Sequence, residues 1–375
     1  MRILTYKYND VDQIGWNFSK VEFTKVNLLV GDTATGKTRL LNTIFNLGRF
    51  VASNEFKNGS WDITFKHNNV TYRWILETER TKDSEVAIIQ DSIWKVEEEK
   101  EISIVKRNKT SFKFNDKEIP KLSLKENSVW LLREEELIKP IYEGFSNIMQ
   151  RRFFGDELIN ISGYQTIPFN FIEKMKKERN LKTLFVAEFN LSVTLYFLSE
   201  YFKDIFNRIC DIYKSIFPFI TETKMLDLSD LKKNISVPGP MPAFCIKEKR
   251  VDKWIPIAEL SSGMQKVLLM LTDIFVLPEG GIYLIDEYEH SLGINAINFF
   301  PSLILEFEKD IQFIVTSHHP YIINEIPVGN WYVFHRKGSQ VTIKHGDELA
   351  ERFGKSKQKA FIKLINDPFY TEGVE

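Results

Sequence analysis

The amino-acid sequence predicts an α/β fold, and three patterns carry this prediction. An apolar strand pattern over Val26–Val30 runs into a glycine-containing loop, after which apolar residues recur at helical spacing. Two further apolar runs, Ile282–Ile285 and 311–315, have the length of buried strands. Between the first helix and these strands, apolar residues of 61–114 alternate with period two. Because that period is typical of antiparallel strands, we expect an α/β sheet that also carries an antiparallel meander.

Length and composition limit the classes of protein that the chain can belong to. Its 375 residues can bury a large core and suggest two lobes. No apolar run reaches the ~18 residues that cross a bilayer, and the start MRILTYKYND lacks a signal-peptide core. The two cysteines, Cys210 and Cys245, are expected as free thiols in the cytoplasm. With a net charge of −1, any nucleic-acid surface would be a local patch.

The loop after the first strand has the spacing of a phosphate-binding loop. Gly31, Gly36, Lys37 and Thr38 match the pattern G-x-x-x-x-G-K-[ST]. The glycines permit positive φ angles and a close approach of backbone N–H groups to the β-phosphate. Lys37 supplies a charge for the β- and γ-phosphates, and the Thr38 hydroxyl is placed to bind Mg²⁺. The residues expected to contact ATP are Gly31, Asp32, Thr33, Ala34, Thr35, Gly36, Lys37, Thr38 and Arg39.

The helix after this loop supports the prediction. Its apolar residues recur at helical spacing, so its N-terminal dipole would face the phosphates. The apolar residues are Leu40, Leu41, Ile44, Leu47 and Val51. The alternative is a glycine turn before an ordinary helix, which the preceding strand disfavours.

The segments before the loop, 2–8 and 20–23, alternate as strands do. One aromatic residue among them could stack on adenine, although a packed strand face is the favoured interpretation. The candidates are Tyr6, Tyr8, Trp16 and Phe18.

Two acids follow the second apolar run. Ile282–Ile285 ends in Asp286 and Glu287, which is the Walker B pattern. Asp286 would hold Mg²⁺ through its water or together with Thr38. Glu287 would polarise the attacking water as a general base, a role that typically contributes ~10²- to 10⁴-fold in rate. The sequence therefore predicts ATP hydrolysis.

Two further polar segments lie near these strands. Leu260, Ser261, Ser262 and Gly263 precede an apolar helix and, taken alone, form only a helix cap. After residues 311–315 comes the run Thr-Ser-His-His-Pro. A histidine metal pair is disfavoured there, because adjacent side chains after a strand diverge and the chain has no cysteine cluster.

Together these motifs resemble the ABC-type ATPase heads of the OLD and SMC-like families. In chain order they are Walker A at 31–38, the signature loop at 260–265, Walker B at 282–287 and the D-loop at 290–293. In the family's T-x-H-x-P pattern, the switch histidine is His318 and not His319. The sequence D-E-Y-E-H-S-L at Walker B is similar to that of the OLD branch. In transporter ATPases, Pro-Thr-Ser usually follows Walker B.

The resemblance implies an architecture and an assembly. It implies a P-loop NTPase head with the meander in lobe I and a helical lobe II. The implied parts are lobe I at 1–136, the helical insert at 137–258, the rest of the ATPase core at 259–335 and a short extension at 336–375. In such heads two protomers pair head to tail and hold ATP between one Walker A and the partner's signature loop, here Ser261, Ser262 and Gly263. Binding then favours a homodimer or a higher homo-oligomer, and hydrolysis weakens it.

The insert carries several local expectations. Residues 128–132 form a strand candidate, and the acids Glu134, Glu135 and Glu136 suit a helix start. Residues 137–235 are expected to be mostly helical, with the best helical stripe over 191–217. A basic cluster is either a solvated helix face or a phosphate-backbone contact, and the first is favoured. The cluster is Lys174, Lys176, Lys177, Arg179 and Lys182.

The sequence also departs from the family. No Q-loop glutamine is evident, and the candidates are Gln90 and Gln150. Gly293 occupies a place where related sequences often carry histidine. OLD proteins usually continue into a TOPRIM nuclease domain, but the segment after Pro320 is too short for one and lacks an acidic cluster. Any nuclease activity is therefore expected in another chain.

The leading interpretation is a cytoplasmic ATPase switch that controls a separate effector, a nuclease, in bacterial antiphage defence of the Septu or PARIS kind. The defence role depends on resemblance alone. The alternatives are an SMC-like ATPase of DNA repair or chromosome maintenance that binds DNA directly, and a P-loop small-molecule kinase. Glu287 beside Asp286, together with the signature loop, disfavours the kinase. The Walker B wording disfavours a transporter ATPase.

Overall fold

The structure, a computed structural model, forms two compact units. It describes residues 1–11, 15–53, 57–81, 86–98, 100–120, 122–152, 163–231, 239–290, 292–353 and 357–374. The first unit comprises Met1–Arg151, Glu279–Tyr288 and Ile304–Glu375, and the second comprises Arg152–Pro278 and Glu289–Leu303. The expected parts were 1–136, 137–258, 259–335 and 336–375. The two units divide the chain differently, because residues 137–151 make their contacts with the first unit and the signature segment makes its contacts within the second.

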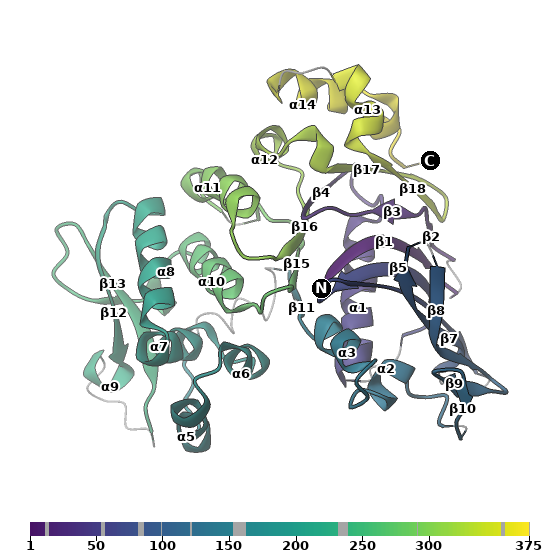
Figure 1. The fold of residues 1–375 in the computed structure, drawn as a ribbon. Helices are drawn as coiled ribbons and strands as arrows, with labels where there is room; N and C mark the ends of the chain where they lie inside the picture. The colour runs from purple at the N-terminus through teal and green to yellow at the C-terminus, as the bar shows by residue number, and fades with distance from the viewer. Residues whose placement is uncertain are drawn as a thin grey trace. The chain divides into compact units, whose positions relative to one another are not determined.

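In the described part of the chain, the first unit is built on one sheet of fifteen strands. Figure 1 shows how the helices of this unit lie about it. Its parallel part runs in the order β17 (Trp331–Lys337), β4 (Val26–Val30), β16 (Gln312–Thr316), β15 (Ile282–Ile285) and β11 (Ile148–Arg151). Every residue of β4, β15 and β16 is buried, as expected for parallel strands covered on both faces. The three predicted buried strands are thus confirmed, the third with a shift of one residue.

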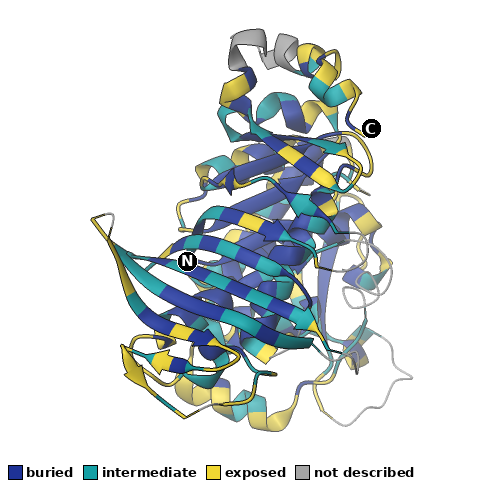
Figure 2. Ribbon diagram, turned by 90° about the vertical axis from the view of Figure 1, so that its right-hand side faces the viewer, coloured by how far each residue is buried: buried dark blue, intermediate teal, exposed yellow. Residues whose placement is uncertain are grey.

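The antiparallel part of the same sheet is the predicted meander. Its strands pair in chain order: β5 (Ser60–His67), β6 (Val70–Arg80), β7 (Val86–Glu97), β8 (Lys100–Asn108), β9 (Phe112–Phe114) and β10 (Lys117–Glu118). Figure 2 shows buried and less buried residues alternating along these strands. The meander is confirmed. The sequence T-K-D-S at 81–84 predicts one of its turns, and residues 82–84 lie outside the described residues.

The remaining strands of this sheet join its two parts. β5 pairs with β1 (Arg2–Asn9), which also pairs with β2 (Asn17–Phe18) and β3 (Val21–Glu22). β2 continues to β18 (Gln340–His345), and β18 forms a hairpin with β17.

Helix α1 (Lys37–Ser53) begins inside the phosphate-loop motif. Its five predicted apolar residues are fully buried. Full burial stabilises the fold by roughly 1.5–3 kcal/mol for each such side chain, which fixes the start of the helix beside the strand ends.

Two predictions after the meander are wrong. Residues 128–132 do not form a strand, since Ser128–Leu131 is the short helix α2. The Asn127 side chain caps this helix by accepting a hydrogen bond from Trp130 N at 2.8 Å, so capping overrides the apolar pattern. The three acids Glu134, Glu135 and Glu136 are exposed in turns before α3 (Lys139–Phe145), not in the first turn of a helix.

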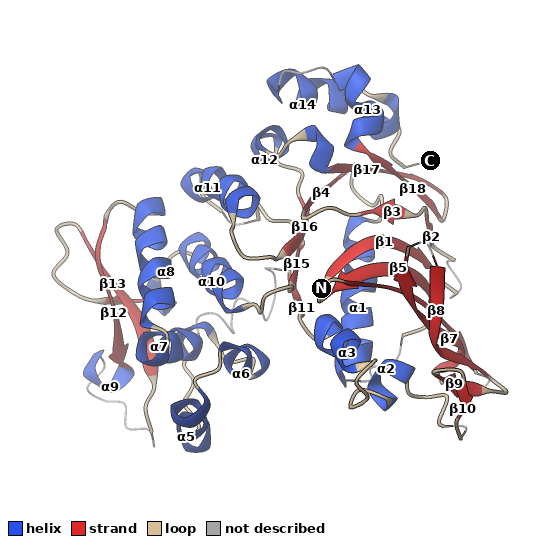
Figure 3. Ribbon diagram, viewed as in Figure 1, coloured by secondary structure: helices blue, strands red, loops and turns tan. Residues whose placement is uncertain are grey.

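The second unit is mainly helical (Figure 3). Its first helices are α5 (Phe169–Glu178), α6 (Leu181–Val186), α7 (Leu191–Tyr201), α8 (Lys203–Ile216) and α9 (Leu228–Leu231). Its small sheet joins β12 (Ile220–Asp227), β13 (Pro242–Glu248) and β14 (Ile255–Pro256), and the turn η1 (Ile257–Glu259) leads to α10 (Ser262–Val276). Helix α11 (Ile294–Glu306) begins in this unit and ends in the first.

The helical prediction for 137–235 holds in part. The strands β11 and β12 interrupt it, and the predicted stripe over 191–217 is two helices that break at Phe202. Phe202 has φ −135° and ψ 55°, which no helix accommodates. The lysines of the basic cluster on α5 are exposed and Lys176 pairs with Glu173 at 3.0 Å, so a solvated helix face describes them. The proline and glycine residues of 237–242 predict the end of this helical region, and residues 237 and 238 lie outside the described residues.

The last part of the first unit packs beside β17. Its elements are α12 (Pro320–Glu325), the turn η2 (Val328–Asn330), α13 (Gly346–Phe353), α14 (Lys357–Ile365) and α15 (Pro368–Thr371). The sequence predicts strands at 331–334 and 341–344 and a helix near 358–365, and the structure confirms all three. Within the described part of the chain, no helix combines the length and apolarity that a membrane crossing requires.

Candidate nucleotide-binding site

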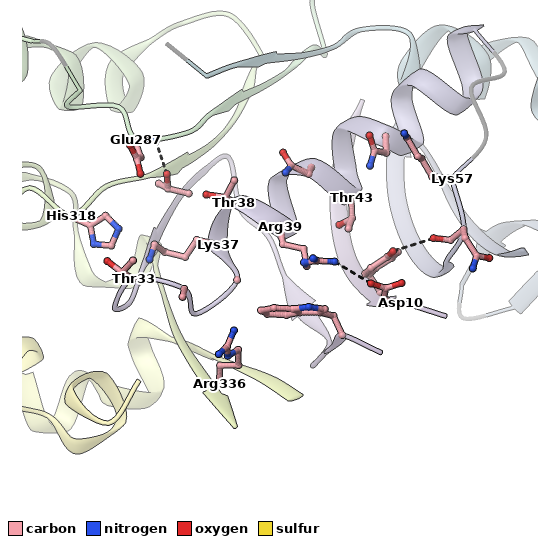
Figure 4. A pocket seen from close by; sticks show the side chains of 18 of the residues that line it. Asp10, Thr33, Lys37, Thr38, Arg39, Thr43, Lys57, Glu287, His318 and Arg336 are labelled. Atoms are coloured by element: carbon pink, nitrogen blue, oxygen red, sulfur yellow. Dashed lines mark hydrogen bonds and ion pairs between the residues drawn. The ribbon is translucent and has the colours of Figure 1, made fainter. Parts of the chain in front are cut away.

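A cavity of about 1020 Å³ opens in the first unit where the carboxyl ends of β4, β15 and β16 meet. Its walls come from the phosphate loop, from α1, and from the ends of β15, β16 and β17 (Figure 4). In parallel sheets this edge is where ligands bind. Segments far apart in the sequence therefore supply one site within one unit.

The loop adopts the backbone conformation that its glycines predict. Gly31 has φ +154° and Gly36 has φ +102°, and a Cβ on Gly31 would lie 2.9 Å from Phe334 O. The loop residues that line the cavity are Thr33, Ala34, Gly36, Lys37, Thr38 and Arg39. Gly31, Asp32 and Thr35 instead shape the loop, in which Thr35 Oγ1 donates to Asp32 O at 2.8 Å.

Lys37 is held inside this loop. Its side chain is 6% exposed, and Nζ donates to Gly31 O and Asp32 O, both at 2.8 Å. A buried ammonium needs acceptors, and these two carbonyls provide them. Phosphate oxygens are stronger acceptors for the same donors, so Lys37 is poised to exchange its partners.

Four residues connect the phosphate loop with the Walker B strand. Thr38 Oγ1 donates to Asp286 Oδ1 at 3.0 Å, and Thr316 Oγ1 donates to the same oxygen at 2.8 Å. Glu287 N donates to Thr316 Oγ1 at 2.7 Å. Asp286 is buried, whereas Glu287 is exposed toward the cavity with φ +49°. A glutamate in this strained region is held by its surroundings, as is common at functional sites.

The hydroxyl of Thr38 and the carboxylate of Asp286 fit a magnesium ion. Mg²⁺ binds oxygen at 2.0–2.1 Å in an octahedron, so two adjacent ligands lie roughly 2.9 Å apart. The two oxygens here are 3.0 Å apart. No group of three or more His, Cys, Asp or Glu in the described residues is placed to hold a metal. The other ligands would therefore be phosphate oxygens and water.

The two histidines after β16 separate as the sequence predicts. His318 is exposed and lines the cavity. His319 caps α12, where its Nδ1 accepts a hydrogen bond from Tyr321 N at 3.3 Å. The structure therefore brings His318, and not His319, to the site.

Two further residues lie beside the site: Thr316, for which the sequence predicted no role, and Gln150, one of the two Q-loop candidates. Thr316 ends β16 and connects both acids, although it stands two residues before the singled-out histidine. Gln150 lies on β11 next to β15, and its Nε2 donates at 3.0 Å to Oδ1 of Asn42, a residue that lines the cavity. Gln90 pairs within the meander instead. The sequence alone could not show which of Gln90 and Gln150 lies at the site, because the strand β11 was not predicted.

The signature residues belong to the second unit. Ser261 and Ser262 are exposed, and Ser261 caps α10 through a long hydrogen bond of 3.4 Å from Met264 N. Gln265 Nε2 donates to Ile257 O and Leu260 O at 2.9 and 3.0 Å, which fixes the loop.

The helix that follows is firmly anchored. Gly263 is buried, and the fully buried Lys266 donates to His290 O at 2.7 Å. The signature helix thus contacts the D-loop segment, whose residue 291 lies outside the described residues.

The candidate stacking aromatics divide into two pairs. Tyr6 and Phe18 are fully buried in the core, as the packed-face interpretation requires. Tyr8 and Trp16 line the cavity.

A family model describes residues 26–324 as "AAA domain, putative AbiEii toxin, Type IV TA system". The chain belongs to this family, AAA_21. No curated protein sequence matches this AAA_21 chain. Its fold matches solved structures of SMC heads. A structure titled as the SmcHead bound to the C-winged helix domain of ScpA aligns with 12% identity and a TM-score of 0.56, covering 92% of this chain and 97% of that one.

A second SMC head, with an extended coiled coil and bound to the C-terminal domain of ScpA derived from Pyrococcus furiosus, aligns with 14% identity and a TM-score of 0.50. The alignment covers 92% of this chain and 96% of that one. The AAA_21 chain therefore has the mixed α/β fold of an SMC-head P-loop ATPase, and its family implies a nucleotide as ligand.

Proposed function

We propose that this chain is an Mg²⁺-dependent ABC-type ATPase that acts as a homodimer and switches a separate effector. One observation carries the ATPase part: the hydrogen bonds from Thr38 through Asp286 and Thr316 to Glu287. They join the phosphate loop to the acid expected to activate water.

Each residue has a distinct role in this proposal. Lys37 leaves the two loop carbonyls and binds the β- and γ-phosphates of ATP. Thr38 and Asp286 hold Mg²⁺, which when bound neutralises charge on the phosphate oxygens. Glu287 takes a proton from the attacking water as general base. His318 reaches the γ-phosphate from the end of β16.

The signature loop completes the site from a partner protomer. Exposed Ser261 and Ser262 stand at the N-terminus of α10, a 15-residue helix. The N–H groups and the dipole of such a helix end favour an anion. In a homodimer, Ser261 and Gly263 would meet the γ-phosphate bound by the other chain. ATP would then hold the dimer together, and its hydrolysis would release it.

The biological role is proposed from resemblance. The motif wording resembles the OLD branch, and the family description names a putative toxin of a toxin–antitoxin system. Both support a cytoplasmic antiphage switch with a separate nuclease effector. The alternative is an SMC-like ATPase of DNA repair or chromosome maintenance, which the fold favours. Nuclease activity in a co-purified partner would support the first, and ATP-dependent DNA binding by the chain alone the second.

Glu287→Gln tests the ATPase proposal directly. We expect the variant to bind ATP, to hydrolyse it roughly 10²- to 10⁴-fold more slowly, and to accumulate as a dimer with ATP on size exclusion. The matched control is Glu136→Gln, which changes an exposed acid in a turn. A Glu287→Gln protein that hydrolyses ATP at the normal rate would remove Glu287 from the role of base.

A further inference from the structure

Arg336 on β17 lines the same cavity, although no motif of the sequence pointed to it (Figure 4). Its guanidinium carbon lies 5.0 Å from the centroid of the Trp16 ring, and that of Arg39 lies 4.7 Å from it. A Cβ on Gly36 would come within 3.1 Å of the same ring. Trp16, Arg39 and Arg336, which we call the Trp16 cluster, therefore adjoin the phosphate loop at its last glycine.

The two arginines of the cluster differ in their charge partners. Arg39 forms an ion pair with Asp10 at 3.1 Å, and the Asp10 side chain is only 6% exposed. No carboxylate in the described part of the chain forms an ion pair with Arg336. Of the two arginines in the Trp16 cluster, Arg39 thus has a carboxylate partner and Arg336 has none among the described residues.

Two donors of the cluster also lack acceptors. Arg336 Nε and Trp16 Nε1 are buried and have no hydrogen-bond partner among the described residues. Buried donors are nearly always paired in folded proteins, and each exception calls for an explanation. An indole N–H and a guanidinium beside a cavity suit a ligand with several acceptors.

We propose that Arg336 and Trp16 bind the nucleoside part of the nucleotide, and that the segment 367–374 positions Arg336. This inference deepens the proposed function and rests on it. The phosphates already have Lys37 and the loop N–H groups. The cavity, at about 1020 Å³, is far larger than a triphosphate needs. Ring nitrogens of the base and hydroxyls of the ribose supply the acceptors that the cluster lacks.

The segment 367–374 contacts both Arg336 and the phosphate loop. Arg336 N donates to Gly373 O at 2.8 Å, and Arg336 bridges to Val374 in parallel register. A Cβ on Gly373 would lie 3.1 Å from Asp32 Cβ and 2.8 Å from Tyr370 O. The segment therefore packs against the loop so closely that residue 373 has no room for a side chain.

A neighbouring contact strengthens this attachment. The His335 ring stacks on Phe369, with centroids 4.9 Å apart and planes 27° apart. Any movement of Arg336 on nucleotide binding would consequently pass to the segment 367–374. The segment thus positions Arg336 and does not itself contact the nucleotide.

Arg336→Leu tests the nucleoside contact. We expect its affinity for Mg·ATP in calorimetric titration to fall at least 10-fold, while its affinity for inorganic tripolyphosphate stays within twofold of wild type. Lys37→Ala should lose both ligands, so failure of the phosphate site and failure of this inference are distinguishable. The matched control is Lys337→Leu, which removes an exposed cation from the next position. Equal losses of affinity for ATP and for tripolyphosphate would show that Arg336 binds phosphate. Unchanged affinities for both ligands would show that Arg336 does not contact the nucleotide. Either result overturns the proposal.

Gly373→Val tests the positioning role. We expect the affinity for ATP to fall at least threefold further than the affinity for tripolyphosphate. The new side chain would press on Asp32 of the phosphate loop, which affects both ligands, and would also separate Gly373 O from Arg336 N, which affects ATP alone. Glu372→Val is the control, since residue 372 is exposed. Hydrogen exchange offers a second readout in the wild-type chain: ATP should slow exchange of the Arg336 amide, and tripolyphosphate should not. Exchange that ATP leaves unchanged would overturn the link between the nucleotide and the segment.

Discussion

The two units present their serine and threonine hydroxyls in different ways. In the first unit, Thr38 and Thr316 both donate to Asp286, and Thr316 also accepts from the backbone of Glu287. In the second unit, Ser261 is exposed, and among the described residues its hydroxyl makes only the long capping bond from Met264 N. The hydroxyls of the first unit are hydrogen-bonded to one another's partners beside a cavity, whereas those of the second unit are exposed at the N-terminus of α10.

This difference indicates how work is divided within the proposed dimer. In this proposal the first unit holds the residues that would bind nucleotide and activate water, and hydrogen bonds already join Thr38, Asp286, Thr316 and Glu287. The second unit offers hydroxyls on a firmly anchored helix, whose Gln265 and Lys266 fix both the loop before it and the D-loop segment. A rigid helix end is a suitable donor to a partner's γ-phosphate.

Exchange of subunits tests this division most severely. Ser261→Arg should abolish hydrolysis and spare ATP binding, and Lys37→Ala should lose ATP binding. Mixing the two proteins would pair an intact phosphate loop with an intact signature loop in one of the two sites. We therefore expect hydrolysis to reappear in the mixture, measured as phosphate release against each variant alone. If the mixture stays inactive, the shared site is wrong and the first unit would have to act alone.

Sequence reasoning succeeded where a local pattern sets the structure. The strand Val26–Val30, the glycines of the loop and the helix after it follow from residues close in the chain, and the structure has them as predicted. The acids Asp286 and Glu287 follow a strand that was also predicted correctly. Parallel strands then bring their carboxyl ends together, so the cavity was predictable in outline.

The predictions were wrong or incomplete where contacts with residues distant in the sequence determine the secondary structure or the position of a side chain. Residues 128–132 have an apolar strand pattern, but the Asn127 cap and its hydrogen bond to Phe50 O make them helical. The strand β11 is stable because it pairs with β15, more than 130 residues later, so Gln150 could not be placed from its neighbours in sequence. Arg336 carries no motif at all, and only the fold brings it to Trp16.

Thr316→Val removes the residue that connects the two acids. The change keeps the side-chain shape and deletes the bonds to Asp286 and to the backbone of Glu287. Loss of a hydrogen bond to a charged group costs ~1.5–3 kcal/mol, so we expect the hydrolysis rate to fall roughly 10- to 100-fold. ATP affinity should change much less. Thr342→Val, at an exposed position of β18, is the control, and equal hydrolysis rates in the two variants would contradict the role of Thr316.

Gln150→Leu should have a smaller effect, since Gln150, a Q-loop candidate, contacts the cavity only through its hydrogen bond to Asn42. Loss of its 3.0 Å hydrogen bond costs about 1 kcal/mol, equivalent to roughly fivefold in hydrolysis rate. Gln90→Leu is the matched control, because Gln90 pairs with Glu77 and Asn108 in the meander. A larger loss in the Gln90 variant would reverse the assignment between the two glutamines.

The smallest effect concerns the two cysteines, which report on the rigidity of the second unit. Burial raises the pKa of Cys210 to about 11 and that of Cys245 to about 12. Since the thiolate is the reactive form, only about one molecule in a thousand would carry it at Cys210 at pH 8, and fewer at Cys245. We therefore expect iodoacetamide to leave both thiols unmodified at pH 8 in the native protein and to modify both in urea, as read by mass spectrometry. Rapid native modification that ATP suppresses would show that the second unit opens without nucleotide, and the signature helix would then not be the rigid donor that the proposed dimer needs.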